Sequence, residues 1–194
     1  MRALLRTAAW LDWLNDGIGR AVGWLAALLV IVGVVNVVGR YAGSFIGMQL
    51  SSNSLLEAQT YIYSLIFLLG AAHLLRREGH IRVDIVYAAR TQRTRVWIDI
   101  VGTLVLLLPF CGLGLFLSLD YTAQSWADLE RSPNPGGLPR YPIKTIIPVA
   151  FGLLFLQGLS ELVKRIAWLR GVPGATAPGA DSLQSSCDDR EGKG

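Results

Sequence analysis

The two histidines are the residues of this sequence whose side chains most readily hold a metal cofactor. His73 comes near the end of a long apolar stretch, and His80 follows it in the adjoining arginine-rich segment. A membrane cytochrome holds haem between histidines on facing helices, and two histidines in one segment cannot easily bracket one iron. The sequence contains no Cys/His cluster, glycine-rich phosphate loop or nucleophile motif. We therefore expect no cofactor, no metal and no enzymatic activity.

Ionisable side chains are missing from the middle of the long apolar stretches, where they would mark an ion or proton path. Asn36 is the most notable polar residue there, and we expect it to make a hydrogen bond between helices. Glu57 lies at the outer end of the second stretch, where two roles are open. It can cap that helix, because carboxylates suit helix N-termini, or it can meet a cation of a partner protein.

The composition is that of a membrane protein. Hydrophobic residues make up 52% of the chain and charged residues 16%, against roughly a quarter charged in soluble domains. Four stretches are long and apolar enough to span a bilayer, and backbone groups in lipid must pair within helices. These stretches are residues 22–38, 58–75, 100–119 and 145–160, the last extending to 163 but interrupted by Glu161. The sequence therefore predicts an all-α integral membrane protein with four transmembrane helices.

Two further segments have the pattern of interfacial amphipathic helices, so we expect one or two of them. Residues 79–95 place apolar side chains at helical spacing opposite arginines, although a solvated loop is the alternative. Residues 1–21 have a similar pattern with tryptophans suited to the membrane interface. The expected organisation is an N-terminal interfacial helix, a transmembrane domain over residues 22–170, and a disordered Gly-, Ala-, Ser- and Pro-rich tail over residues 171–194.

The positive charges predict the orientation of the chain. All but four of the 18 lysines and arginines lie on the side that carries both termini and the segment after the second stretch. The exceptions are Arg40, Arg131, Arg140 and Lys144. Because cytoplasmic loops are enriched in lysine and arginine, both termini are expected in the cytoplasm. The net charge of +4 therefore reflects topology, and we expect no nucleic-acid partner.

Four segments follow one another in a characteristic order. NVVGRY closes the first stretch, EAQTYIYSLIFLLGAAHLLRREGHIRVDIVY covers the second, WIDIVGTLVLLLPF opens the third, and ERSPNPGGLPRYPIKTIIPVAFGLLFLQGLSELVKRI covers the outer loop and the fourth. Over residues 11–169 this order resembles the small membrane subunit, the DctQ-like component, of tripartite ATP-independent periplasmic (TRAP) transporters. The most specific part of the resemblance is the cluster of His80, Arg82 and Asp84.

The resemblance implies a small permease subunit of a binding-protein-dependent secondary transporter in the bacterial inner membrane. Such a system takes up organic acids with an ion gradient, and this subunit is a scaffold for the large permease subunit. The other implied partners are a periplasmic substrate-binding protein and the lipid bilayer. The resemblance assigns no catalytic residues. Our candidates for structural or interface roles are Arg40, Glu57, His80, Arg82, Asp84 and Glu130.

Other functions remain open from the residues alone. The chain could anchor a redox enzyme in the membrane, or it could be a self-contained small transporter. The outer loop before the fourth stretch could touch the binding protein through charged residues such as Glu130, or it could be solvated.

Overall fold

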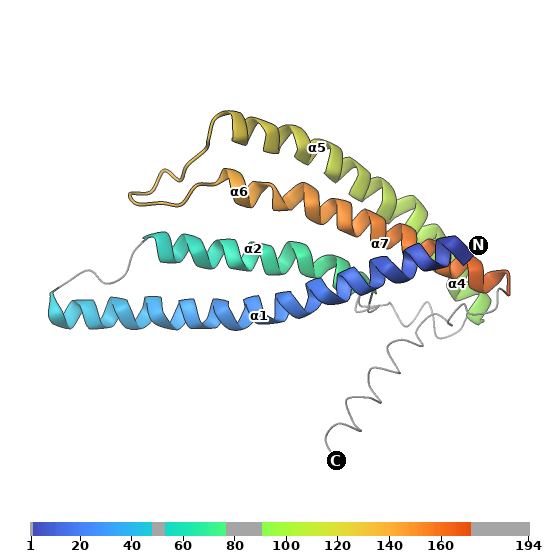
Figure 1. Cartoon of the computed structure of the whole chain (residues 1–194), viewed down its shortest axis with the longest axis horizontal. Coiled ribbons are helices and arrows are strands. Elements are labelled where there is room, and N and C mark those ends of the chain that lie inside the picture. Colours follow the sequence, from blue (N-terminus) through green and yellow to red (C-terminus); the bar gives the residue numbers. More distant parts are fainter. Residues whose placement is uncertain (1, 48–52, 77–90, 172–194) are drawn as a thin grey trace, which may run out of the picture. The chain divides into compact units, whose positions relative to one another are not determined.

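The computed structural model describes residues 2–47, 53–76 and 91–171 (Figure 1). These residues are 88% helical and include no β-strand. Four helical segments are long and apolar enough to cross a membrane: Thr7–Ile46, Asn53–Arg76, Arg93–Ala127 and Tyr141–Leu169. The predicted all-α integral membrane fold with four transmembrane helices is therefore confirmed.

Helix α1 runs without a break from Arg2 to Ile46. At about 1.5 Å per residue its 45 residues extend for about 68 Å, more than twice the roughly 30 Å hydrocarbon core of a bilayer. Residues 1–21 were expected as a helix of their own. From Arg2 on they are helical, but they join the first transmembrane segment with no turn between them. Part of α1 must therefore lie outside the hydrocarbon core.

The third membrane segment is built from three consecutive pieces: α4 (Gln92–Gly102), the π-helical turn η1 (Thr103–Leu107) and α5 (Leu108–Ala127). The N–H of Leu108 donates to the carbonyl of Thr103, five residues earlier. Pro109 follows immediately; it has no N–H to donate, and its ring crowds the carbonyl four residues before it. The wider π turn accommodates the proline without ending the helix.

The fourth membrane segment joins the short helix α6 (Tyr141–Lys144) to α7 (Ile146–Leu169). Pro148 falls in the first turn of α7, where its missing N–H has no partner within the helix in any case. Glu161 interrupts the apolar pattern of the sequence, but α7 continues through it for two more turns. The remaining membrane helix, α2, spans Asn53–Arg76.

The chain divides into two compact units. The first, which we call the terminal unit, comprises Met1–Asp16, Ala72–Leu113 and Gly152–Gly194. The second, which we call the loop unit, comprises Gly17–Ala71 and Gly114–Phe151. In the terminal unit, Val96, Ile100 and Leu162 form a small buried apolar core between α4 and α7.

Helix α5 ends in the loop unit with a Schellman-type turn. The N–H of Glu130 donates to the carbonyl of Ser125 at 3.1 Å, and Leu129 between them has a φ of 45°. Glycine usually occupies this left-handed position, because a β-carbon is disfavoured there. The turn directs the chain out of α5 and into the outer loop, residues 128–140.

Gly114 allows α5 and α7 to approach closely within the loop unit. A β-carbon on Gly114 would lie 2.6–2.9 Å from three ring atoms of Phe151. We expect Gly114→Ala to destabilise the protein by about 1–3 kcal/mol, because the ring must move in a packed contact. Thermal unfolding of the purified protein in detergent measures this effect.

Gly112→Ala is the matched control for that substitution. Its added β-carbon would lie 3.9 Å from Phe155, an ordinary contact, and the variant also gains helix propensity. Equal melting temperatures for the two alanine variants would show that the close approach at Gly114 is unimportant.

Candidate functional site

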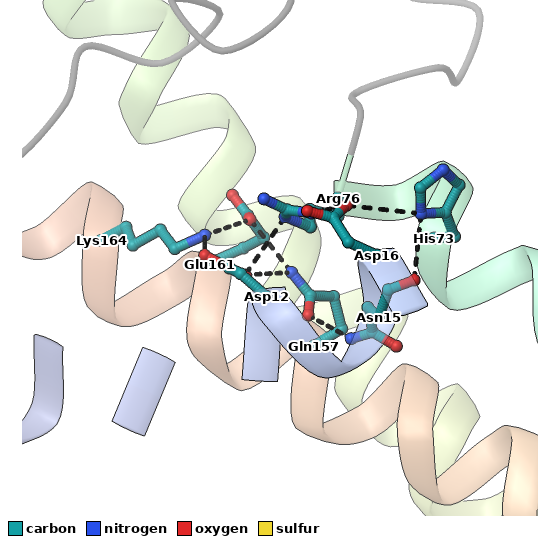
Figure 2. Close-up of polar contacts among 8 residues, drawn as sticks. All are labelled: Asp12, Asn15, Asp16, His73, Arg76, Gln157, Glu161 and Lys164. Atoms are coloured by element: carbon teal, nitrogen blue, oxygen red, sulfur yellow. Dashed lines mark hydrogen bonds and ion pairs between the residues drawn. The ribbon is translucent and has the colours of Figure 1, made fainter. Parts of the chain in front are cut away.

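Charged and amide side chains from three helices meet in the terminal unit (Figure 2). One face of α1 carries Asp12, Asn15 and Asp16, which are three or four residues apart around Asp12. One face of α7 carries Gln157, Glu161 and Lys164 at the same spacing. His73 and Arg76 come from the last turn of α2. We call these eight residues the polar cluster.

Asp12 contacts three other members of the polar cluster. Its Oδ2 lies 2.6 Å from Nζ of Lys164, and its Oδ1 accepts a hydrogen bond from Nε2 of Gln157 at 3.1 Å. Nε of Arg76 lies 3.7 Å from the same Oδ1. Lys164 also donates to Glu161 at 3.1 Å. The Asp12 and Lys164 side chains are only 15% and 20% exposed, so solvent screens their attraction less than at an open surface.

The rest of the polar cluster is joined through Asp16 and Asn15. Arg76 forms an ion pair with Asp16. Nδ1 of His73 lies 3.1 Å from the backbone carbonyl of Asn15, which can only accept, so this nitrogen carries the proton. The buried Asn15 donates to the buried Gln157 at 2.6 Å. Figure 2 shows these contacts linking α1, α2 and α7.

Arg165 of α7 also forms an ion pair with Asp99 of α4 in this unit, at 3.3 Å. Both side chains are nearly buried. These ion pairs thus link α1, α2, α4 and α7 within the described part of the terminal unit. In the described ranges, no group of three or more His, Cys, Asp or Glu side chains could hold a metal ion.

Reasoning from the sequence did not single out the polar cluster. His73 was considered only as a haem ligand and Glu161 only as an interruption of the fourth stretch, while Arg76 and Lys164 entered only the count of positive charges. The available signal was the spacing of Asp12 and Asp16, and of Gln157 and Glu161, each four residues apart in a helix.

The loop unit contains a second polar site, centred on Glu57 of α2. Its carboxylate accepts hydrogen bonds from Oγ of Ser132, from Nδ2 of Asn134 at 3.0 Å and from the backbone N–H of Leu138 at 2.6 Å. Glu57 lies beyond the first turn of α2 and does not cap it. The carboxylate instead holds the outer loop, a role that the sequence did not suggest.

The outer loop is also fastened to α2 at its glycine- and proline-rich turn. Oγ of Ser54 donates to the carbonyl of Gly136 at 2.5 Å, and the hydroxyl of Tyr61 donates to that of Pro139 at 3.2 Å. Gly136 has a φ of 72°, a conformation that favours glycine. The outer loop has no more than an isolated bridge between Arg131 and Pro139.

Glu130 closes the base of the outer loop. It accepts hydrogen bonds from Lys144 and from Oγ of Ser125, the latter at 2.8 Å. These bonds, that from Lys144 first, hold the pKa of Glu130 below its usual value of 4.5. Nζ of Lys144 also lies 4.1 Å from the centre of the Tyr121 ring.

The lowered pKa makes the stabilisation by Glu130 dependent on pH. Since the unfolded chain binds this proton more tightly, the stabilisation is present above about pH 4.5 and is lost as the pH falls through the lowered pKa. Glu130→Gln should therefore melt below the wild type at pH 7, and the gap should close on acidification to about pH 3. Melting curves across this range, with Asp128→Asn as an exposed control, measure the gap. A gap that does not change with pH would rule out this role for the charge.

Among the six candidates for structural or interface roles, Glu57 and Glu130 act on the same element in the described residues, because both hold the outer loop. Arg40 lies exposed on α1 and makes no ion pair with a residue that the structure describes. His80, Arg82 and Asp84 lie outside the described residues, as does most of the segment 79–95. The end of that segment, from residue 92, is the first turn of α4. The tail from residue 172 also lies outside.

Four helices that can span a membrane define a multi-pass helical membrane protein. A family model described as "Tripartite ATP-independent periplasmic transporters, DctQ component" matches residues 29–167. The chain therefore belongs to the DctQ family and is a small component of a TRAP transporter. The comparisons with curated proteins and with solved structures returned no match.

Proposed function

We propose that this subunit is a scaffold that binds the large permease subunit, in a transporter that takes up organic acids with an ion gradient. A periplasmic binding protein delivers the solute, and the large subunit carries the solute and ion sites. The observation that supports this role most directly is the contrast between the polar and apolar groups of the membrane helices. The charged groups of the cluster are paired within the chain, whereas many large apolar side chains of the membrane helices are exposed.

The pairing of charges argues against a transport path through this chain alone. A path for ions or organic acids needs polar groups that can exchange partners with the solute. Asp12 and Glu161 are both paired with Lys164 instead, and Asp99 is paired with Arg165. Such an arrangement suits a subunit that holds its own helices in place.

The uncovered apolar surface requires lipid or a second membrane protein. In the most apolar 18-residue window of α1 only 6% of the residues are buried, and the same share holds for α2. Trp24, Val34 and Phe67 are each more than half exposed. A large permease subunit would cover part of this surface, and the close packing of helices in membranes favours such an interface.

The charge distribution supports an inner-membrane protein with both termini in the cytoplasm. The outer loop would then face the periplasm. A reporter that is active only in the periplasm should work when fused after Asn134 and fail after Gly171. The opposite pattern would reverse the proposed orientation.

Reconstitution tests the scaffold role. The tagged chain should co-purify with a much larger membrane subunit, and liposomes containing both, together with the binding protein, should accumulate an organic acid when an ion gradient is imposed. Liposomes that contain this chain alone should accumulate none. Uptake by the chain alone, or a fully active large subunit without it, would refute the proposal.

A further inference from the structure

The loop unit contains a cavity of about 450 Å³ beside the outer loop. Its walls come from the first three turns of α2, from the loop and from α6. The lining residues are Asn53, Leu56, Glu57, Thr60, Tyr61, Ser64, Asn134, Arg140, Ile143 and Lys144.

The guanidinium N–H groups of Arg140 are the donors that the cavity offers to a ligand. Both oxygens of Glu57 are occupied by the outer loop, and Lys144 is paired with Glu130. By contrast, the half-buried guanidinium of Arg140 forms no ion pair or side-chain hydrogen bond with any residue that the structure describes. The charge of Arg140 attracts the carboxylates of Glu57 and Glu130, but no described residue forms a hydrogen bond or close ion pair with its guanidinium. An arginine side chain has five N–H donors and no acceptor, so these donors can bind an anion without displacing a hydrogen-bonded partner.

The hydroxyl groups of the cavity wall already donate hydrogen bonds to backbone carbonyls. The hydroxyls of Thr60 and Ser64 donate to carbonyls of their own helix, at 3.2 and 2.8 Å. The Tyr61 hydroxyl donates to the outer loop. Because their protons are already used, these side chains present mainly acceptors to the cavity.

The cavity also lies at the ends of membrane helices. Asn53 and Tyr141 are the first residues of two membrane-spanning segments, and both begin within or beside the cavity wall. The lining residues Leu56 and Ile143 are apolar, and Leu56 is 41% exposed. Such a site combines a cation at headgroup level with apolar surface for an acyl chain.

We propose that this cavity binds an oxyanion through Arg140, and that the oxyanion is the phosphate of a membrane phospholipid. The planar guanidinium donates two parallel hydrogen bonds to phosphate oxygens, and basic pockets at membrane boundaries recognise lipid headgroups in this way. Leu56 and Ile143 contact the beginning of the acyl chains. The site is independent of the transported solute and of the large subunit.

Native mass spectrometry of the full-length protein tests this assignment. The delipidated protein in detergent is titrated with dioleoyl phosphatidylglycerol, and bound lipids are counted. We expect Arg140→Gln to weaken the tightest binding event by at least about fivefold, and Arg140→Lys to weaken it less, because lysine keeps the charge but not the fork. Arg131→Gln is the matched control, since Arg131 is an exposed arginine of the same loop that does not line the cavity.

A second variant keeps Arg140 and occupies the cavity. Thr60 is exposed and lines the wall, so Thr60→Trp should fold and should weaken lipid binding as Arg140→Gln does. Parallel titrations with inorganic phosphate and with succinate separate the lipid from a free anion. The assignment to a phospholipid would be refuted if Arg140→Gln weakened the binding of phosphate or succinate but left lipid binding unchanged. Equal lipid binding by the wild type and every variant, or equal losses in Arg140→Gln and Arg131→Gln, would refute the site.

Discussion

Replacing Asp12 with leucine is expected to destabilise the terminal unit by about 3 kcal/mol, the largest effect among single substitutions in the polar cluster. Asp12 is the carboxylate that Lys164 and Arg76 share, and Gln157 donates to it as well. Without it two largely buried cations lose a partner, and the N-terminal part of α1 loses its ion pair with α7. The expected readout is a lower melting temperature of the purified protein and a smaller yield of complex with the large subunit.

Two control variants separate a lost ion pair from a mere change of charge. Asp16→Asn also removes a carboxylate bound to Arg76, but the Asp16 side chain is 38% exposed and should contribute less than about 1 kcal/mol. Asp128→Asn removes an exposed loop carboxylate and should have no measurable effect. If Asp12→Leu were no more damaging than Asp128→Asn, the polar cluster would not hold these helices together.

Replacing Glu57 with glutamine is expected to release the outer loop while leaving the membrane helices folded. The carboxylate accepts from three donors of the loop, and a glutamine amide offers one oxygen and places an NH₂ group against the others. Arg131 is an exposed trypsin site within this loop. Cleavage after Arg131 should become roughly tenfold faster, because it follows the population of the opened loop.

Asn53→Ala provides the comparison for Glu57→Gln. Its hydrogen bond to the carbonyl of Pro135 is long, at 3.5 Å, so its loss should change the rate of cleavage little. If the Glu57→Gln loop were cut no faster than that of the wild type, the carboxylate would not position it. If the loop also docks the binding protein, the same variant should slow uptake without changing the binding protein's affinity for solute.

The sequence alone determined the membrane class of this protein, its four spanning segments and its family. The spans were predictable because transfer of a helix into lipid depends on the apolar content of about 20 consecutive residues, which is a local property. The irregular outer loop was predictable for a similar reason, since proline and glycine act on the backbone where they occur. Helix boundaries were less predictable. Residues 1–21 were expected as an interfacial helix before the first span, and in the structure α1 runs from Arg2 to Ile46 without a break.

Only the tertiary structure decided which polar residues work together. Asp12 and Lys164 lie near opposite ends of the described chain, and their contact depends on which faces of α1 and α7 meet. Glu57 had two possible roles in the sequence, and its actual role required the outer loop to fold back onto α2. The unused donors of Arg140 became apparent only when the partners of Glu57 and Lys144 were known. Pairings of this kind arise from the packing of distant segments, and neither local composition nor helical periodicity contains that information.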